Sequence, residues 1–121
     1  MPEYIAIDLG DMGKQLIIAG LRDWDGPARS SARIDQFFGF SDPEARRMEF
    51  EKLMQNVIDG RPLTIFQWTL SLLAAELIFA SDVVGTGRKW GAIFSESDED
   101  WFVALRDLQR RIPHDRRALG L

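Results

Sequence analysis

The sequence of 121 residues contains no cysteine and a single histidine, His114. Without cysteine the chain can form neither a disulfide, nor a thiolate nucleophile, nor a cysteine-bound zinc site. A Ser-His-Asp triad needs a histidine held rigidly beside its nucleophile, whereas His114 follows a proline in a polar stretch near the end of the chain. The sequence therefore predicts no catalytic residues.

Metal and cofactor sites lack support as well. The tightest acidic cluster is Asp98, Glu99 and Asp100. Consecutive residues of a helix point in different directions, so these carboxylates cannot converge on one ion. They are typical of the first turn of a helix, where the helix dipole favours negative charge. We expect neither a metal nor a cofactor.

The chain carries 19 acidic and 15 basic residues, which gives a net charge of −4. General nucleic-acid binding requires a broad basic surface, so nucleic acid is not the expected partner. The charge is distributed unevenly: residues 106–117 hold five arginines against two aspartates, a net charge of +3, and the rest of the chain holds −7. This asymmetry is a reason to expect partners of either sign, with another protein as the favoured class.

No basic segment followed by an apolar run opens the chain, as it would in a secretory signal. Residues 63–80 are apolar enough to raise the question of a membrane span. They contain Gln67 and Glu76, however, and a carboxylate in lipid costs roughly 3 kcal/mol or more. We therefore expect a cytoplasmic protein without a membrane segment.

Residues 63–80 are instead predicted to be the central helix of the fold. Their apolar side chains wrap most of the way round a helix, which is typical of a helix surrounded by others. Thr64, Gln67 and Ser71 leave a narrow polar line on one side. A second copy of the chain would be one way to cover so apolar a helix, so a homodimer is compatible with the sequence.

The N-terminal residues give a weaker signal. Residues 4–9 alternate as in a strand, and residues 89–94 are the candidate partner strand. Residues 11–24 fit a helix with Asp11 as its N-cap, while a β-hairpin through Gly10 and Gly13 is the alternative interpretation of the same residues. We favour the helix.

Capping patterns and apolar stripes predict three further helices. Ser41 and Glu44 have the spacing of a capping box, with Pro43 in the first turn, so a helix is expected over residues 43–59. Ser97 is expected to cap the last helix. The apolar stripe of that helix is Trp101, Leu105, Leu108 and Ile112, and a short helix over residues 30–38 has Ile34, Phe37 and Phe38 on one face. We expect Trp24, Trp68 and Trp101 in the core.

Residues 81–96 form the predicted loop richest in functional residue types. Its GTGRKWG segment matches neither a Walker loop, because Trp90 follows Lys89, nor the Rossmann G-x-G-x-x-G pattern. Tryptophan and arginine dominate interface hot spots, and loops often carry function. Asp82, Arg88, Lys89 and Trp90 are therefore predicted to form an interaction loop, against the alternative that Trp90 packs into the core.

Glu76 lies within the apolar run, so we expect it to be at least half buried. A buried carboxylate must find a partner or take up a proton. The preferred interpretation is a structural pair with Arg88 or Arg106, and the alternative is a general base or a ligand anchor. Glu76 is therefore the candidate buried polar anchor.

Together these observations predict a mainly α fold: a single-domain bundle of four to five helices around residues 63–80, with a small two-stranded β element. Residues 1–112 are expected to form the helical domain, and residues 113–121 a basic, flexible tail. The sequence favours a small acidic protein-interaction module without catalytic activity, a regulatory or inhibitory binding protein of the type that bacterial immunity proteins exemplify. The alternative is a small-molecule-binding protein or enzyme with a pocket formed by Glu76 and the glycine-rich loop 81–91.

Overall fold

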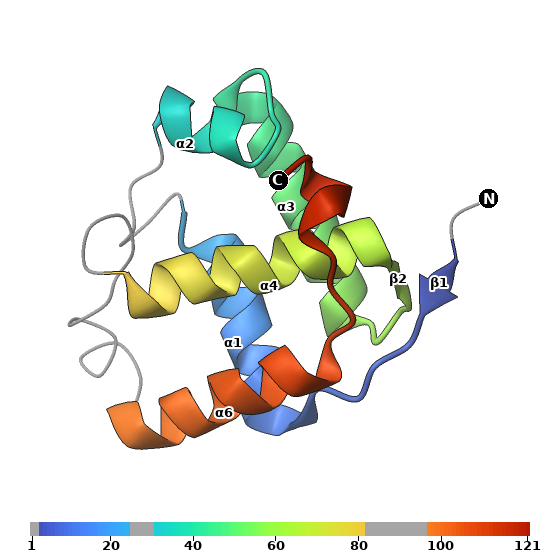
Figure 1. The fold of residues 1–121 in the computed structure, drawn as a ribbon, viewed down its shortest axis with the longest axis vertical. Helices are drawn as coiled ribbons and strands as arrows, with labels where there is room; N and C mark the ends of the chain where they lie inside the picture. Colours follow the sequence, from blue (N-terminus) through green and yellow to red (C-terminus); the bar gives the residue numbers. More distant parts are fainter. Residues whose placement is uncertain (1–2, 25–30, 82–96) are drawn as a thin grey trace.

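The computed structural model describes residues 3–24, 31–81 and 97–121. Helices dominate this part of the chain and pack against one another, which confirms the predicted mainly α fold (Figure 1). The elements follow in the order β1 (Tyr4–Ile5), α1 (Gly10–Arg22), α2 (Ala32–Phe37), α3 (Pro43–Ile58), β2 (Leu63–Thr64), α4 (Ile65–Ala80), α6 (Asp98–Arg111) and the 3-10 helix η2 (Arg116–Leu119).

Helix α4 is the centre of the fold, as predicted. It contacts α1, α6 and η2, and in Figure 1 it crosses the middle of the molecule with α2 and α3 above it and α6 below. The helix begins two residues later than expected, because Thr64 and Gln67 form a capping box: the Thr64 side chain accepts from the Gln67 N–H, and the Gln67 side chain accepts from the Thr64 N–H. Two of the three residues of the predicted polar line thus start the helix, and the third, Ser71, is fully buried.

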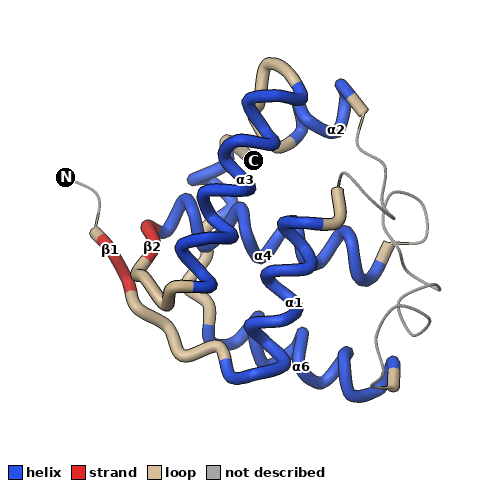
Figure 2. Tube along the Cα trace, turned by 180° about the vertical axis from the view of Figure 1, so that it is seen from behind, coloured by secondary structure: helices blue, strands red, loops and turns tan. Residues whose placement is uncertain are grey.

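The β element is confirmed but is smaller than expected. Strand β1 pairs antiparallel with β2, with Tyr4 opposite Thr64 and Ile5 opposite Leu63. Figure 2 shows the two strands side by side at one edge of the molecule, next to the start of α4. The indole Nε1 of Trp68 donates to the carbonyl of Ile5 at 2.9 Å and ties the sheet to α4. The other candidate strand, residues 89–94, lies outside the described residues.

Helix α1 confirms the helical interpretation of the N-terminal region, whereas its predicted N-cap was wrong. Leu9 occupies the cap position without a capping side chain, and Asp11 lies within the first turn. The Asp8 side chain instead accepts from the N–H of Gly10 at 3.1 Å. An acidic residue inside the first turn still complements the helix dipole, so the local charge pattern indicated the right helix with the wrong start.

Two glycines let α1 approach its neighbours closely. A Cβ on Gly20 would lie 2.5 Å from the Cα of Ala75 in α4, and a Cβ on Gly13 would lie 2.7 Å from Cδ2 of Leu108 in α6. Contacts this short are incompatible with a side chain unless a neighbour moves. Gly20 therefore sets the distance between the backbones of α1 and α4.

A buried ion pair joins α2 to α3. Nε of Arg46 lies 2.5 Å from Oδ1 of Asp35, and both side chains are only 1% exposed. The guanidinium also lies over the ring of Phe50, 5.2 Å from its centroid. The predicted apolar face of α2 was therefore partly wrong: Phe38 is buried, but Phe37 is 48% exposed and Asp35 points inward in its place.

The start of α3 corrects the predicted capping box. The cap is Asp42, whose Oδ1 accepts from the N–H of Ala45 at 2.7 Å, and not Ser41. Pro43 directly follows Asp42 and occupies the first helical turn, so the helix begins one residue later than a Ser41 cap would place it. Glu44 pairs with Arg47 at 3.2 Å on the outer face, as the spacing predicts.

Helix α6 agrees with its prediction. The Ser97 side chain accepts from the N–H of Asp100 at 3.2 Å. The predicted stripe is buried, and so are the three tryptophans assigned to the core: Trp24, Trp68, Trp101, Leu105, Leu108 and Ile112.

Candidate functional site

The best candidate site is a small cavity between α4 and the C-terminal segment, which we call the C-terminal pocket. Its volume is about 130 Å³. Helix α4 supplies one wall and the last eight residues of the chain supply the other. The pocket is lined by Thr69, Leu72, Leu73, Glu76, His114, Arg116, Leu119 and Leu121.

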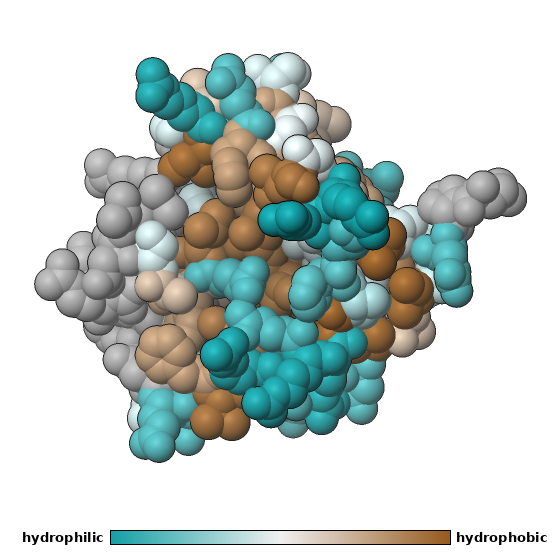
Figure 3. Space-filling view, in the orientation of Figure 1, coloured by the Kyte–Doolittle hydropathy of each residue, from teal (hydrophilic) through white to brown (hydrophobic). Residues whose placement is uncertain are grey.

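The α4 wall is one face of the helix. Thr69, Leu72, Leu73 and Glu76 follow the spacing i, i+3, i+4 and i+7, which places their side chains in one stripe. Apolar residues gather over the middle of α4 in the space-filling view, with hydrophilic residues of the C-terminal segment beside them (Figure 3). The pocket thus has an apolar floor and a polar rim.

The C-terminal wall is attached to α4 through Thr69. Its Oγ1 donates to the carbonyl of Ile65 at 2.7 Å and accepts from the N–H of Asp115 at 3.0 Å. Leu119, from η2, packs against the core. The sequence predicts a flexible tail for residues 113–121, whereas the structure places this segment against α4. The docking joins residues 46 positions apart, a relationship that local apolar content does not reveal.

Within that segment, Asp115 and Arg117 form a tight local pair. The Asp115 side chain caps η2 by accepting from the Arg117 N–H, and its two oxygens accept from Arg117 Nε at 3.1 Å and Nη2 at 3.0 Å. Hydrogen bonds from the Arg117 side chain, followed by those from its backbone, lower the pKa of Asp115 below its ordinary value of 3.8. The same carboxylate raises the pKa of Arg117.

Glu76 is mostly buried, as the sequence predicts, but its direct partner is not an arginine. Its Oε2 accepts from Nε2 of Gln109 on α6 at 2.6 Å. Arg106 donates to Oε1 of the same Gln109 at 3.0 Å, so the predicted pair with Arg106 runs through an intervening amide. The other predicted partner, Arg88, lies outside the described residues.

His114 belongs to the pocket, although its position after the last helix argued against any site. Its Nδ1 lies 2.8 Å from the carbonyl of Ile112. A carbonyl can only accept, so Nδ1 carries a proton, and Nε2 is the ring nitrogen left for other interactions. Sequence reasoning missed this residue because the docking of its segment onto Thr69 is a long-range contact.

The pocket is lined by two residues of opposite charge, Glu76 and Arg116, that do not pair with each other. In the part of the chain that the structure describes, Glu76 bonds Gln109 and forms no ion pair with Arg116, which lies exposed at the rim. One carboxylate oxygen of Glu76 and the whole guanidinium of Arg116 therefore remain available to a bound group.

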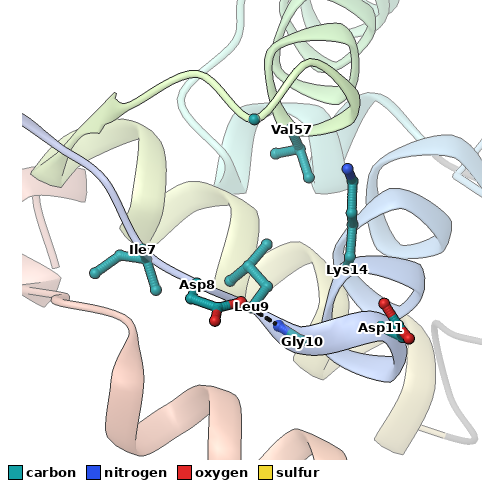
Figure 4. Close-up of a pocket in the computed structure, with 8 residues that line it drawn as sticks. Ile7, Asp8, Leu9, Gly10, Asp11, Lys14 and Val57 are labelled. Atoms are coloured by element: carbon teal, nitrogen blue, oxygen red, sulfur yellow. Dashed lines mark hydrogen bonds between the residues drawn. The ribbon is translucent and has the colours of Figure 1, made fainter.

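A second cavity, of about 290 Å³, lies at the start of α1 and is lined in part by Asp8, Asp11 and Lys14 (Figure 4). Two of these polar groups already form hydrogen bonds that stabilise the fold. Asp8 bonds the N–H of Gly10, and the Lys14 Nζ donates to the carbonyl of Ile58 at 3.0 Å, at the end of α3. We therefore assign this cavity a structural role.

The predicted interaction loop, Asp82, Arg88, Lys89 and Trp90, lies outside the described residues. Within residues 3–24, 31–81 and 97–121 there is no group of three or more acidic or histidine side chains arranged to hold a metal ion. Over the same ranges, no helix combines the length and hydropathy needed to cross a bilayer.

The chain matches no protein-family model, no curated protein and no solved structure. Its function is therefore inferred from the geometry of its own residues.

Proposed function

We propose that this chain is a small acidic protein-interaction module, regulatory or inhibitory in type, that binds a partner protein through one apolar side chain held in the C-terminal pocket. The observation that carries the proposal is the size and lining of that pocket. Its volume is about 130 Å³, whereas sites for drug-sized ligands measure roughly 300–1,000 Å³. A cavity this small has room for about one side chain.

The lining supports the same interpretation. Leu72, Leu73 and Leu119 form an apolar floor, and an apolar anchor in a desolvated pocket with a polar rim is the arrangement found at interface hot spots. The net charge of −4 disfavours nucleic acid as the partner. The absence of cysteine fits a reducing compartment, so we also infer a cytoplasmic location.

A second candidate, a small-molecule-binding protein or enzyme, is favoured by one observation. Glu76 and His114 line the same cavity, and a carboxylate with an imidazole is a common acid–base pair. The small volume restricts such a ligand to a few non-hydrogen atoms. We rank this function second for that reason.

The test is native mass spectrometry of the protein purified gently from its own host. Leu121 lines the pocket and is 49% exposed, so Leu121→Asp changes the pocket without burying a charge. Met48→Asp is the matched control, because Met48 is 63% exposed on α3 and does not line the pocket.

We expect a co-purifying protein with the wild type and with Met48→Asp, and its loss with Leu121→Asp. A partner that survives Leu121→Asp would contradict the assignment of this pocket. A small added mass that disappears on denaturation, and that Glu76→Gln abolishes, would favour the second candidate.

A further inference from the structure

The C-terminal pocket combines three chemical features that few ligands satisfy at once. It has an apolar floor, an exposed guanidinium from Arg116 and a carboxylate oxygen from Glu76. A matching ligand carries an apolar side chain, a negative group and an N–H donor on neighbouring atoms. The last residue of a protein chain has this composition, since its α-carbon bears the side chain, the terminal carboxylate and the backbone N–H.

We propose that the pocket binds the C-terminal residue of a partner chain, with an aliphatic side chain on the floor and the terminal carboxylate at Arg116. The inference rests on the proposed function and names the part of the partner that enters the pocket. Capture of a terminal carboxylate is an established mode of peptide recognition.

Of the two adjacent arginines in η2, we expect Arg116 and not Arg117 to bind the carboxylate, because the charge of Arg117 is already paired with Asp115. Arg117 is held by both oxygens of Asp115. Arg116 lines the pocket and forms no ion pair within the described residues. A guanidinium binds a carboxylate through two parallel N–H donors. The unpaired guanidinium of Arg116 therefore suits a terminal carboxylate better than an acceptor with a single oxygen. His114 is not part of this receptor, because its Nδ1–H is bonded to the Ile112 carbonyl and the Nε2 of the neutral ring can only accept a hydrogen bond.

Glu76 supplies the acceptor for the N–H of the bound residue. Its Oε2 is occupied by Gln109, and its Oε1 accepts no hydrogen bond within residues 3–24, 31–81 and 97–121. An acceptor beside a carboxylate receptor also sets the direction of the bound chain. An internal aliphatic residue of a partner would bring an N–H and a side chain but no carboxylate, and would leave Arg116 unused, whereas an internal aspartate or glutamate would bring a carboxylate but no aliphatic side chain for the floor.

The experiment uses amide chemical shifts of the full chain during titration with four N-acetylated probes. N-acetyl-leucine carries all three groups, N-acetyl-leucinamide lacks the carboxylate, and N-acetyl-alanine lacks the aliphatic side chain. The fourth probe is an N-acetylated six-residue peptide that ends in leucine with a free carboxylate. Free leucine is titrated as well, because it shares the side chain and carboxylate but carries an ammonium group.

We expect saturable shifts at Leu72, Leu73 and Leu119. A hydrogen-bonded charge is worth about tenfold in affinity or more, so N-acetyl-leucine should bind at least about tenfold more tightly than its amide. Because burial of the leucine side chain removes apolar surface from water, N-acetyl-leucine should also bind more tightly than N-acetyl-alanine, again by about tenfold. The peptide should bind at least as tightly as N-acetyl-leucine. Arg116→Gln should reduce binding of the acid to the level of the amide. The matched control is Arg110→Gln, which removes an exposed arginine of α6 that does not line the pocket and should leave binding unchanged.

Three outcomes would overturn the inference, and they separate it from the proposed function. Equal binding of N-acetyl-leucine and its amide would refute recognition of a terminus and leave the apolar anchor standing. Tighter binding of free leucine than of the peptide would assign the pocket to a free amino acid. No shifts in the pocket with any probe would refute both this inference and the use of the pocket as an anchor.

Discussion

Asp35 of α2 and Arg46 of α3 face each other across a helix interface, 2.5 Å apart and almost completely removed from water. A buried charge left without its partner is costly, typically about 3–5 kcal/mol. We therefore expect Arg46→Met to lower the free energy of unfolding by about that amount in urea denaturation.

The control is Glu44→Gln, which breaks the exposed pair with Arg47 on the same helix. Exposed pairs contribute about 0–1 kcal/mol, so this variant should unfold almost as the wild type does. If Arg46→Met and Glu44→Gln cost the same, the buried pair does not stabilise the α2–α3 interface.

Gly20→Ala should destabilise the protein although alanine is the better helix former. Its Cβ would meet the backbone of Ala75, which cannot move without separating α1 from α4. Overpacking of this kind costs about 1–3 kcal/mol. Gly13→Ala in the same helix meets only the end of the Leu108 side chain, which can rotate, so it should cost less. A thermal midpoint that falls further for Gly13→Ala would contradict the close crossing at Gly20.

The hydrogen bond between Glu76 and Gln109 predicts that Gln109→Glu destabilises the protein. Gln109→Glu would place two carboxylates at the 2.6 Å contact, and like charges so close cannot both ionise without cost. The thermal midpoint at neutral pH should fall, and the loss should diminish as the pH is lowered and one carboxyl group takes up a proton.

The double variant Glu76→Gln/Gln109→Glu should recover most of the loss, because it restores one donor and one acceptor and brings a carboxylate to Arg106. A loss of stability in the double variant equal to the sum of the two single losses would mean that the two side chains do not interact.

The cap of α3 can be tested by two neighbouring substitutions. Asp42→Ala removes the acceptor of the Ala45 N–H and should cost about 1 kcal/mol. Ser41→Ala should cost little, because Ser41 does not cap the helix. A larger loss of unfolding free energy for Ser41→Ala than for Asp42→Ala in chemical denaturation would instead support Ser41 as the cap, as expected from the sequence.

Asp115 should titrate below its ordinary value of 3.8. A carboxyl group whose pKa is lower in the folded state stabilises that state above its ordinary pKa, and this contribution is lost as the pH falls through the lowered value. The carboxyl carbon shift of Asp115, followed against pH, measures it. Arg117→Gln should move the midpoint upward towards 3.8, and a wild-type midpoint at or above 3.8 would refute the pairing with Arg117.

Local periodicity was enough to find the helices but not the pocket. Trp101, Leu105, Leu108 and Ile112 repeat at helical spacing and are all buried. By contrast, Arg46 shares its stripe of α3 with the buried Phe50, Leu53 and Val57, but the stripe alone does not say whether so polar a side chain is buried in an ion pair or turned out to solvent. That choice depends on where α2 comes to lie.

Because local patterns do not reveal long-range contacts, the sequence predicted Glu76 as a site residue but not His114 and Arg116. Glu76 could be singled out, because a carboxylate in an apolar run is anomalous within its own helix. His114 and Arg116 could not be joined to it, because their approach depends on the bond between Thr69 and Asp115. Long-range docking of a polar segment has no local apolar signature.

Two adjacent residues near the start of α4 hold opposite ends of the chain. Trp68 binds Ile5, 63 positions earlier, and Thr69 binds Asp115, 46 positions later. During synthesis on the ribosome, α4 emerges with one of these partners already made and the other still to come. The C-terminal wall of the pocket can close only after residue 115 has left the exit tunnel, so the pocket forms later than the contact between Trp68 and Ile5 can form.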